Sequence, residues 1–162
     1  MAEGLAIILD VLETEFRGKS WNGLSLAPTL GKLGAAEAAR TDTFEGYSAW
    51  SVALHCTKCK ILAARDLGVA APEWAFPAET WFPEPGDKGQ PAWDRDRATL
   101  ADAHDAMMAG LRAFPASSLG DEMPTWKSPW ETVIAWLVTH DSFHGAQVRS
   151  MGLPTFRTKR HD

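Results

Sequence analysis

The chain of 162 residues is long enough for about one domain with its own core, and its composition, 45% hydrophobic and 23% charged, is that of an ordinary globular protein. A net charge of −5 argues against a general nucleic-acid-binding protein, which usually carries a basic face. Because we find neither a signal peptide nor an apolar run near the ~20 residues that span a membrane, we expect a cytoplasmic protein without membrane contact. The two cysteines, Cys56 and Cys59, do not suggest a disulfide framework.

The first half of the chain predicts two long helices separated by a broken segment. Apolar residues recur at three- and four-residue steps over residues 3–17. Residues 24–40, interrupted by proline and glycine, favour one or two short helices. Residues 47–67 return to helical spacing, with His55 in the middle. Residues suited to cap or end a helix flank these segments: Gly18, Ser48 and Gly68.

The second half predicts an extended loop and two further long helices. Residues 69–92 hold five prolines, which forbid a long helix, so we interpret them as a loop. Residues 94–114 carry a helical apolar stripe. The segment Ser-Pro-Trp-Glu at 128–131 has the pattern of a capping box and predicts a fourth helix, with Ser128 as its N-cap, that ends near Met151. Aromatic residues in or beside the loop are Trp74, Trp81, Phe82 and Trp93.

Four long helical patterns, with no convincing strand and no internal repeat, predict an all-α protein built as a four-helix bundle. No domain boundary interrupts residues 1–154, and we interpret residues 155–162 as a short basic tail that frays into solvent. Metal and cofactor sites in helix bundles form between side chains of facing helices. We therefore expect metal or cofactor ligands on the helices rather than in the loops.

The last predicted helix carries the strongest chemical signal. His140 and His144 are four residues apart, so they lie one turn above each other on one face, and Gln147 shares that face. Two imidazoles at this spacing can chelate one metal ion, although they could also be a surface pair or a satisfied core pair. A metal site needs a third ligand, and His55 is the natural one because it lies within another helix. Imidazole ligands suit zinc, nickel or iron.

Two segments resemble a known family. Residues 47–55, Tyr-Ser-Ala-Trp-Ser-Val-Ala-Leu-His, are similar to the second helix of the DinB/YfiT-like proteins. Residues 140–147, His-Asp-Ser-Phe-His-Gly-Ala-Gln, resemble the H-x-x-x-H-x-x-Q segment on the last helix of that family. The order of elements is similar along nearly the whole chain, including the Trp-Asn-Gly-Leu-Ser-Leu segment at 21–26.

The resemblance implies a DinB-like four-helix bundle in which His55, His140 and His144 hold a divalent metal ion. It also implies a homodimer, and an activity such as that of the family's thiol-dependent transferases and isomerases, which use a low-molecular-weight thiol near the metal. The loop between helices, rather than the histidines, would then select the small-molecule substrate.

Other polar residues have two interpretations each. Gln147 is either a group that supports the metal or the substrate, or a solvated helix residue. Cys59 lies one turn from His55, so it could be a fourth ligand or a reactive thiol, but we favour a small buried hydrophobe, as for Cys56. His104 has acidic neighbours, which indicates a solvated helix face.

The leading hypothesis is a metal-dependent enzyme, most concretely an S-transferase or isomerase that uses a small thiol. No side chain stands out as a general base, which weakens a hydrolase hypothesis. The alternatives are a non-catalytic protein that binds a metal or small ligand, for example in a stress response, and a structural dimer whose histidines bind metal only adventitiously.

Overall fold

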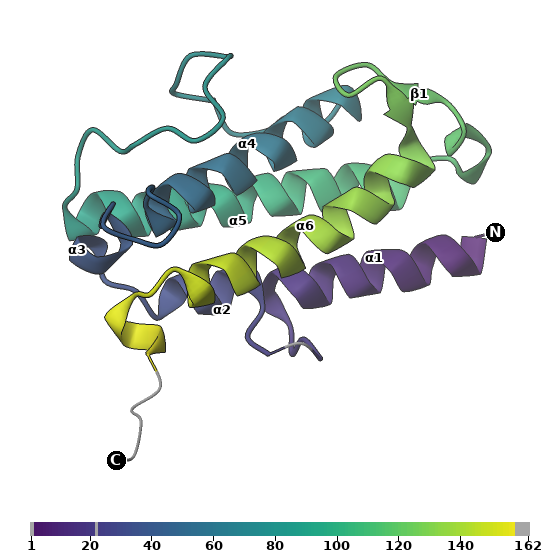
Figure 1. Cartoon of the computed structure of the whole chain (residues 1–162). Helices are drawn as coiled ribbons and strands as arrows, with labels where there is room; N and C mark the ends of the chain where they lie inside the picture. The colour runs from purple at the N-terminus through teal and green to yellow at the C-terminus, as the bar shows by residue number, and fades with distance from the viewer. Residues whose placement is uncertain (1, 22, 158–162) are drawn as a thin grey trace.

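The computed structural model describes residues 2–21 and 23–157 and is mostly helical (Figure 1). The all-α prediction is therefore confirmed for this part of the chain. Its long helices lie side by side, and two short helices connect the first of them to the second. The long helices are α1 (Ala2–Arg17), α4 (Ala49–Asp66), α5 (Gln90–Ala113) and α6 (Trp130–Ser150). The short ones are α2 (Leu26–Gly31) and α3 (Ala35–Ala38).

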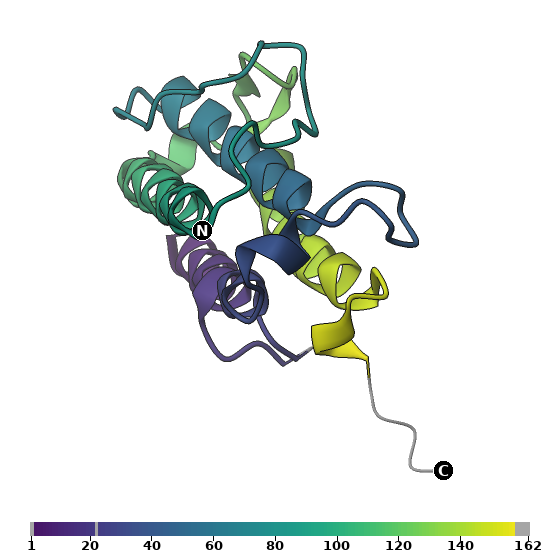
Figure 2. The same ribbon diagram turned by 90° about the vertical axis from the view of Figure 1, so that its left-hand side faces the viewer.

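The long helices pack in pairs, as the view nearly along their axes shows (Figure 2). α4 packs most extensively on α5, α1 packs on α6, and a further contact joins α4 to α6. Buried apolar side chains form two clusters. One contains Trp50 and Trp93 and includes side chains from the C-terminal end of α6. The other contains Met107 and Trp130 and includes side chains from the N-terminal end of α6. Polar side chains on α4 and α6 lie between the two clusters.

The ends of α4 follow the capping predictions. The Ser48 side chain accepts a hydrogen bond from the backbone N–H of Ser51, which satisfies one of the free donors of the first turn. After the last turn, Gly68 has a φ of +73°, and the N–H groups of Gly68 and Val69 donate to the carbonyls of Arg65 and Ala64. This is a Schellman motif, in which glycine takes the left-handed conformation without strain.

α5 begins four residues earlier than the sequence pattern indicates. It starts at Gln90 rather than Asp94, and Pro91 lies in its first turn. Proline is tolerated there because the first N–H groups of a helix have no partner within the helix, so its missing N–H costs nothing. The loop between α4 and α5 therefore ends at Gly89 rather than at residue 92.

The predicted capping box before α6 is wrong. Ser128 and Pro129 form a short strand, β2 (Ser128–Pro129), which pairs antiparallel with β1 (Glu122–Met123), so the expectation of no strand is also wrong. The Ser128 hydroxyl donates to the Trp126 carbonyl rather than capping the helix. Backbone carbonyls of the preceding loop accept from the first N–H groups of α6 instead, over 3.0 Å from Trp130 and 2.9 Å from Glu131.

Short 3₁₀ helices complete the chain. η1 (Ala116–Ser118) follows α5, and η2 (Pro154–Phe156) follows α6. At the start of the predicted tail, both the backbone N–H and the hydroxyl of Thr155 donate to the Glu37 carboxylate. The remainder of that tail, 158–162, lies outside the described residues. Within the described part of the chain, no helix combines the length and the apolarity needed to cross a bilayer.

Candidate metal centre

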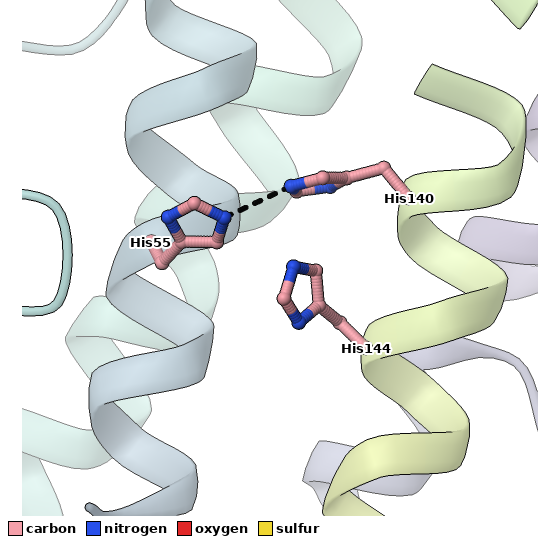
Figure 3. Close-up of side chains that lie close together, drawn as sticks. All are labelled: His55, His140 and His144. Atoms are coloured by element: carbon pink, nitrogen blue, oxygen red, sulfur yellow. Dashed lines mark hydrogen bonds between the residues drawn. The ribbon is translucent and has the colours of Figure 1, made fainter. Parts of the chain in front are cut away.

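The structure brings three histidines together from two neighbouring helices. His55 lies in the middle of α4, and His140 and His144 project from successive turns of α6. In Figure 3 the three imidazoles point toward one another across the space between these helices. His144 is buried, whereas His55 and His140 are half-buried and open toward a pocket. We refer to these residues as the three-histidine cluster.

The spacing of the ring nitrogens fits ligands of a single ion. One nitrogen from each imidazole lies within 4.8 Å of the others. The Nε2 atoms of His55 and His140 are 3.0 Å apart. Two ligands bonded at ~2.0–2.1 Å to a tetrahedral ion lie about 3.3 Å from each other, so this pair needs little adjustment. The ring centroids of His140 and His144 are 4.4 Å apart, as expected for residues one turn apart on a helix.

Hydrogen bonds to the far side of two rings decide which nitrogen faces the cluster with a lone pair. The Nδ1–H of His55 donates to the backbone carbonyl of Trp81 over 3.1 Å, because a carbonyl oxygen can only accept. The Nδ1–H of His144 donates likewise to the side-chain oxygen of Gln147 over 2.8 Å. In both rings Nε2 is then left without a proton, which is the form that binds a metal ion.

The surroundings keep these imidazoles neutral. Burial, together with the neighbouring rings of His140 and His144, lowers the pKa of His55 to about 3. Burial likewise lowers the pKa of His144 to about 4, with His140 adding to the effect. A cation binding near neutral pH therefore has no proton to displace from either ring.

Gln147 is held in place by a second partner. Its amide nitrogen donates to the Tyr47 hydroxyl over 2.7 Å, while its oxygen accepts from His144. Tyr47 precedes α4, so this chain of hydrogen bonds links the cluster back to the start of the helix that carries His55. Gln147 therefore orients His144 rather than extending into solvent.

The loop between α4 and α5 covers the outer side of the cluster. The Phe82 ring stacks on His55, with centroids 4.2 Å apart and planes at 8°. The neighbouring Trp81 supplies the carbonyl that accepts from His55. The Lys58 ammonium donates to the carbonyls of Ala78 and Thr80, and it lies 4.0 Å from the centre of the Trp81 ring. Lys58 thereby fixes this loop against α4.

A pocket of about 370 Å³ opens beside the cluster, a size typical of small-molecule sites. Its wall includes three tryptophans that come from three separate parts of the chain. Trp81 belongs to the loop after α4, Trp126 to the turn between β1 and β2, and Trp136 to α6. The remaining lining residues are His55, Cys59, Leu137 and His140. We call this the tryptophan pocket.

Both cysteines are free, buried thiols. Cys59 Sγ lies 3.9 Å from His55 Nε2, close enough to border the cluster. Burial raises the pKa of Cys59 to about 12, so the neutral thiol predominates, and it is a weak ligand and nucleophile. Burial likewise raises the pKa of Cys56 well above its usual value. These environments support the interpretation of both cysteines as small buried hydrophobes.

A second group of candidate ligands contains Cys56, His140 and Asp141, but a lysine already occupies its carboxylate. The Lys60 ammonium donates to both oxygens of Asp141, over 2.8 and 2.6 Å, and both side chains are almost wholly buried. A nearby ammonium repels a metal cation and saturates the carboxylate. In the three-histidine cluster the charged neighbour is instead a carboxylate, that of Asp141, which lies 3.9 Å from His140 Nδ1, and this cluster is therefore the better cation site.

His104 is not on a solvated face, so that expectation is wrong. Its exposed fraction is 0%, and its ring stacks on Phe16 with centroids 3.8 Å apart. Its Nε2 hydrogen-bonds to the Glu13 carboxylate of α1 over 3.1 Å. The acidic neighbours of His104 in the sequence point elsewhere, because successive residues on a helix lie ~100° apart. Its partners, Phe16 and Glu13, both belong to α1, so His104 lies apart from the three-histidine cluster.

Sequence reasoning missed several groups at this site. Lys60 and Asp141 form a buried pair between α4 and α6, although neither residue stands out in the sequence pattern. The contact of Phe82 with His55 was also not foreseen. Trp136 lines the pocket, whereas Trp50 packs on Trp93 in the core. Each of these contacts joins segments far apart in the chain.

Comparisons with protein-family models, curated proteins and solved structures find no match to this chain.

Proposed function

We propose that this chain is a divalent-metal-dependent enzyme of the DinB-like class, with His55, His140 and His144 as the metal ligands. The observation that carries the proposal is the convergence of three imidazoles, one nitrogen from each within 4.8 Å of the others, beside an apolar pocket. Zinc, nickel or iron would suit this all-nitrogen ligand set, and three protein ligands leave positions open for a substrate.

We also propose that the fold is a four-helix bundle of the DinB/YfiT type. Its support is the side-by-side packing of α1, α4, α5 and α6, together with the placement of all three histidines on two of these helices. Sites between facing helices are the usual location of metal ions in such bundles. A homodimer and a cytoplasmic location belong to the same proposal, on the resemblance alone.

The reaction that we favour is an S-transfer or isomerisation that uses a small thiol. A divalent ion in the cluster would supply Lewis-acid chemistry and favour the deprotonated form of a bound nucleophile near neutral pH. The chain's own residues hold the geometry. Trp81 and Gln147 fix two imidazoles in the tautomer that presents Nε2, and Phe82 shields His55 from water. The tryptophan pocket would orient the organic partner of the reaction.

A non-catalytic binding protein is the second candidate, and the composition of the pocket favours it. The lining residues include no carboxylate, hydroxyl or lysine that could transfer a proton. The Cys59 thiol is held in its neutral form, since burial raises its pKa to about 12. A protein that sequesters a metal ion or a small apolar ligand requires none of these groups.

The first test is elemental analysis of the untagged protein by mass spectrometry, beside His55→Gln and His144→Gln variants that remain folded by circular dichroism. We expect close to one equivalent of zinc, nickel or iron in the parent protein and a trace in both variants. The matched control is His104→Gln, which changes a buried histidine outside the cluster and should keep its metal. Trace metal in the parent protein, without uptake when metal is supplied, would refute both the metal-dependent enzyme and the protein that sequesters a metal ion.

Thiol-dependent turnover then separates the two candidates. The metal-loaded protein is incubated with a small thiol and an apolar electrophile, and loss of free thiol is followed over time. Turnover that disappears in the metal-free protein supports the enzyme. Stoichiometric metal with no turnover for any thiol tested supports the binding protein instead.

A further inference from the structure

We propose that the tryptophan pocket binds a flat, apolar body of a neutral or anionic ligand whose donor atom reaches the three-histidine cluster. This inference rests on the proposed metal site and specifies the class of ligand that the site would select. It favours an aryl or similarly flat compound over a sugar-bearing or cationic one. Three observations support it: the chemistry of the pocket wall, the fixed position of the Trp81 loop, and the charge beside the pocket.

The wall offers apolar area and aromatic faces but almost no hydrogen-bonding groups. Trp81 and Trp136 both line the pocket, and 42% and 51% of their surfaces are exposed to solvent. Such large apolar side chains are usually more deeply buried. A flat ligand that stacks on them would remove this apolar area from water. A sugar would instead lose water at each hydroxyl, and the wall has no amide or carboxylate to replace it.

The wall is formed before a ligand arrives. The Lys58 ammonium, itself only 3% exposed as a residue, donates to two carbonyls of the loop that carries Trp81. The carbonyl of Trp81 also accepts from His55, so the same residue borders the pocket and orients a candidate metal ligand. A ligand that enters the pocket therefore has little loop entropy to remove.

Charge disfavours a cationic ligand. The Lys58 ammonium lies 4.0 Å from the centre of the Trp81 ring and already forms the cation–π contact that a cationic ligand could make with this ring. A divalent ion held by the histidines would add further positive charge beside the pocket, and no acidic residue lines it. A neutral or anionic ligand needs no cation–π contact and is not repelled by the positive charge.

The volume sets the size of the apolar body. The pocket measures about 370 Å³, more than twice the ~150 Å³ of an apolar cavity that holds one benzene molecule. One or two fused rings, together with the donor group, would fill it. The pocket is open to solvent, so longer substituents could extend outward.

The test compares two probes that share a donor and differ only in the apolar body, benzohydroxamate and acetohydroxamate. Each is titrated into the cobalt-loaded protein, and binding is followed by the visible absorption of cobalt and by tryptophan fluorescence. We expect benzohydroxamate to bind between about ten- and a hundredfold more tightly, from the apolar area that its ring buries. Trp136→Ala should reduce this preference by between about two- and tenfold. Trp21→Ala, which removes a tryptophan that is 98% exposed elsewhere, should leave it unchanged.

Each result has a distinct meaning. Equal affinities for the two probes, in protein that holds one equivalent of metal, overturn this inference and leave the proposed metal site standing. A preference that survives Trp136→Ala unchanged also overturns it, because the ring would then bind elsewhere. Failure to take up metal overturns the proposed function and this inference together. A dimer that buries Trp136 and excludes both probes would assign the pocket to a second copy of the chain.

Discussion

The three-histidine cluster and the Lys60–Asp141 pair both lie between α4 and α6, but their polar atoms face different surroundings. In the pair, an ammonium and a carboxylate neutralise each other, and both are almost wholly buried. In the cluster, one nitrogen from each of three imidazoles converges beside an open pocket, and the Asp141 carboxylate lies 3.9 Å from His140 Nδ1. The pair is satisfied by the chain itself, whereas the proposed role of the cluster is to hold a metal ion that the chain does not supply.

This difference teaches how to separate structural polar groups from functional ones in a helical core. Burying a polar atom without a partner costs free energy, so a fully paired set of buried polar groups is accounted for by folding alone. Ring nitrogens that face one another beside a pocket, with the protons of His55 and His144 held on the far side of their rings, are the arrangement expected of a binding site. The following predictions disturb the pair, the cluster and the buried His104 separately, in order of decreasing expected effect.

Removing one partner of the buried pair should have the largest effect. Asp141→Ala leaves the Lys60 ammonium buried without a counter-charge, and we expect the free energy of unfolding to fall by about 3–5 kcal/mol. The measurement is urea unfolding of the metal-free protein. The double variant Lys60→Met with Asp141→Leu should recover most of this loss, because it removes both charges together. A single variant as stable as the parent protein would contradict a structural role for the pair.

Adding metal should stabilise the protein through the cluster alone. At a free metal concentration of 100 times the dissociation constant, the free energy of unfolding should rise by about 2.7 kcal/mol. The same addition to His140→Ala should leave unfolding unchanged, and a chelator should reverse the gain in the parent protein. The measurement is urea unfolding with and without zinc. An equal gain in both proteins would mean that the metal binds outside the cluster.

Acid should weaken the metal-free protein, partly through His104. Burial lowers the pKa of His104 to about 4, below the value of about 6.5 in an unfolded chain. The unfolded state therefore binds more protons between these values, and the stability contributed by the neutral ring is lost as the pH falls. For this group alone we expect a loss of about 2 kcal/mol in the free energy of unfolding between pH 7 and pH 5. His104→Phe should show a shallower pH dependence in urea unfolding, and an unchanged slope would contradict the assignment.

The smallest expected effect concerns the residue that orients His144. Gln147→Ala removes the acceptor for His144 Nδ1, and we expect metal affinity to fall by at least tenfold, or about 1.4 kcal/mol. Calorimetric titration of the metal-free protein measures this. Gln90→Ala, which alters a glutamine near α3 and far along the chain from the cluster, is the matched control. If both variants bind metal equally well, Gln147 has only a packing role.

Much of the secondary structure could be predicted because helical signals are local. Apolar spacing located the long helices, and Ser48 and Gly68 marked both ends of α4. The start of α6 could not be predicted in the same way. The local pattern at 128–131 matches a capping box, but pairing of β2 with β1 places the first two of these residues, Ser128 and Pro129, in a strand. A partner outside the local segment overrode the local preference.

For the candidate site, the sequence by itself determined that His140, His144 and Gln147 share one face of a helix, since a period of 3.6 residues requires it. It also placed His55 within another helix. Only the tertiary structure decided that these imidazoles converge, that Lys60 neutralises Asp141, and that the loop brings Phe82 onto His55. The physical reason is that residue spacing fixes a direction on one helix, whereas the partner found in that direction depends on how the helices and loops pack together.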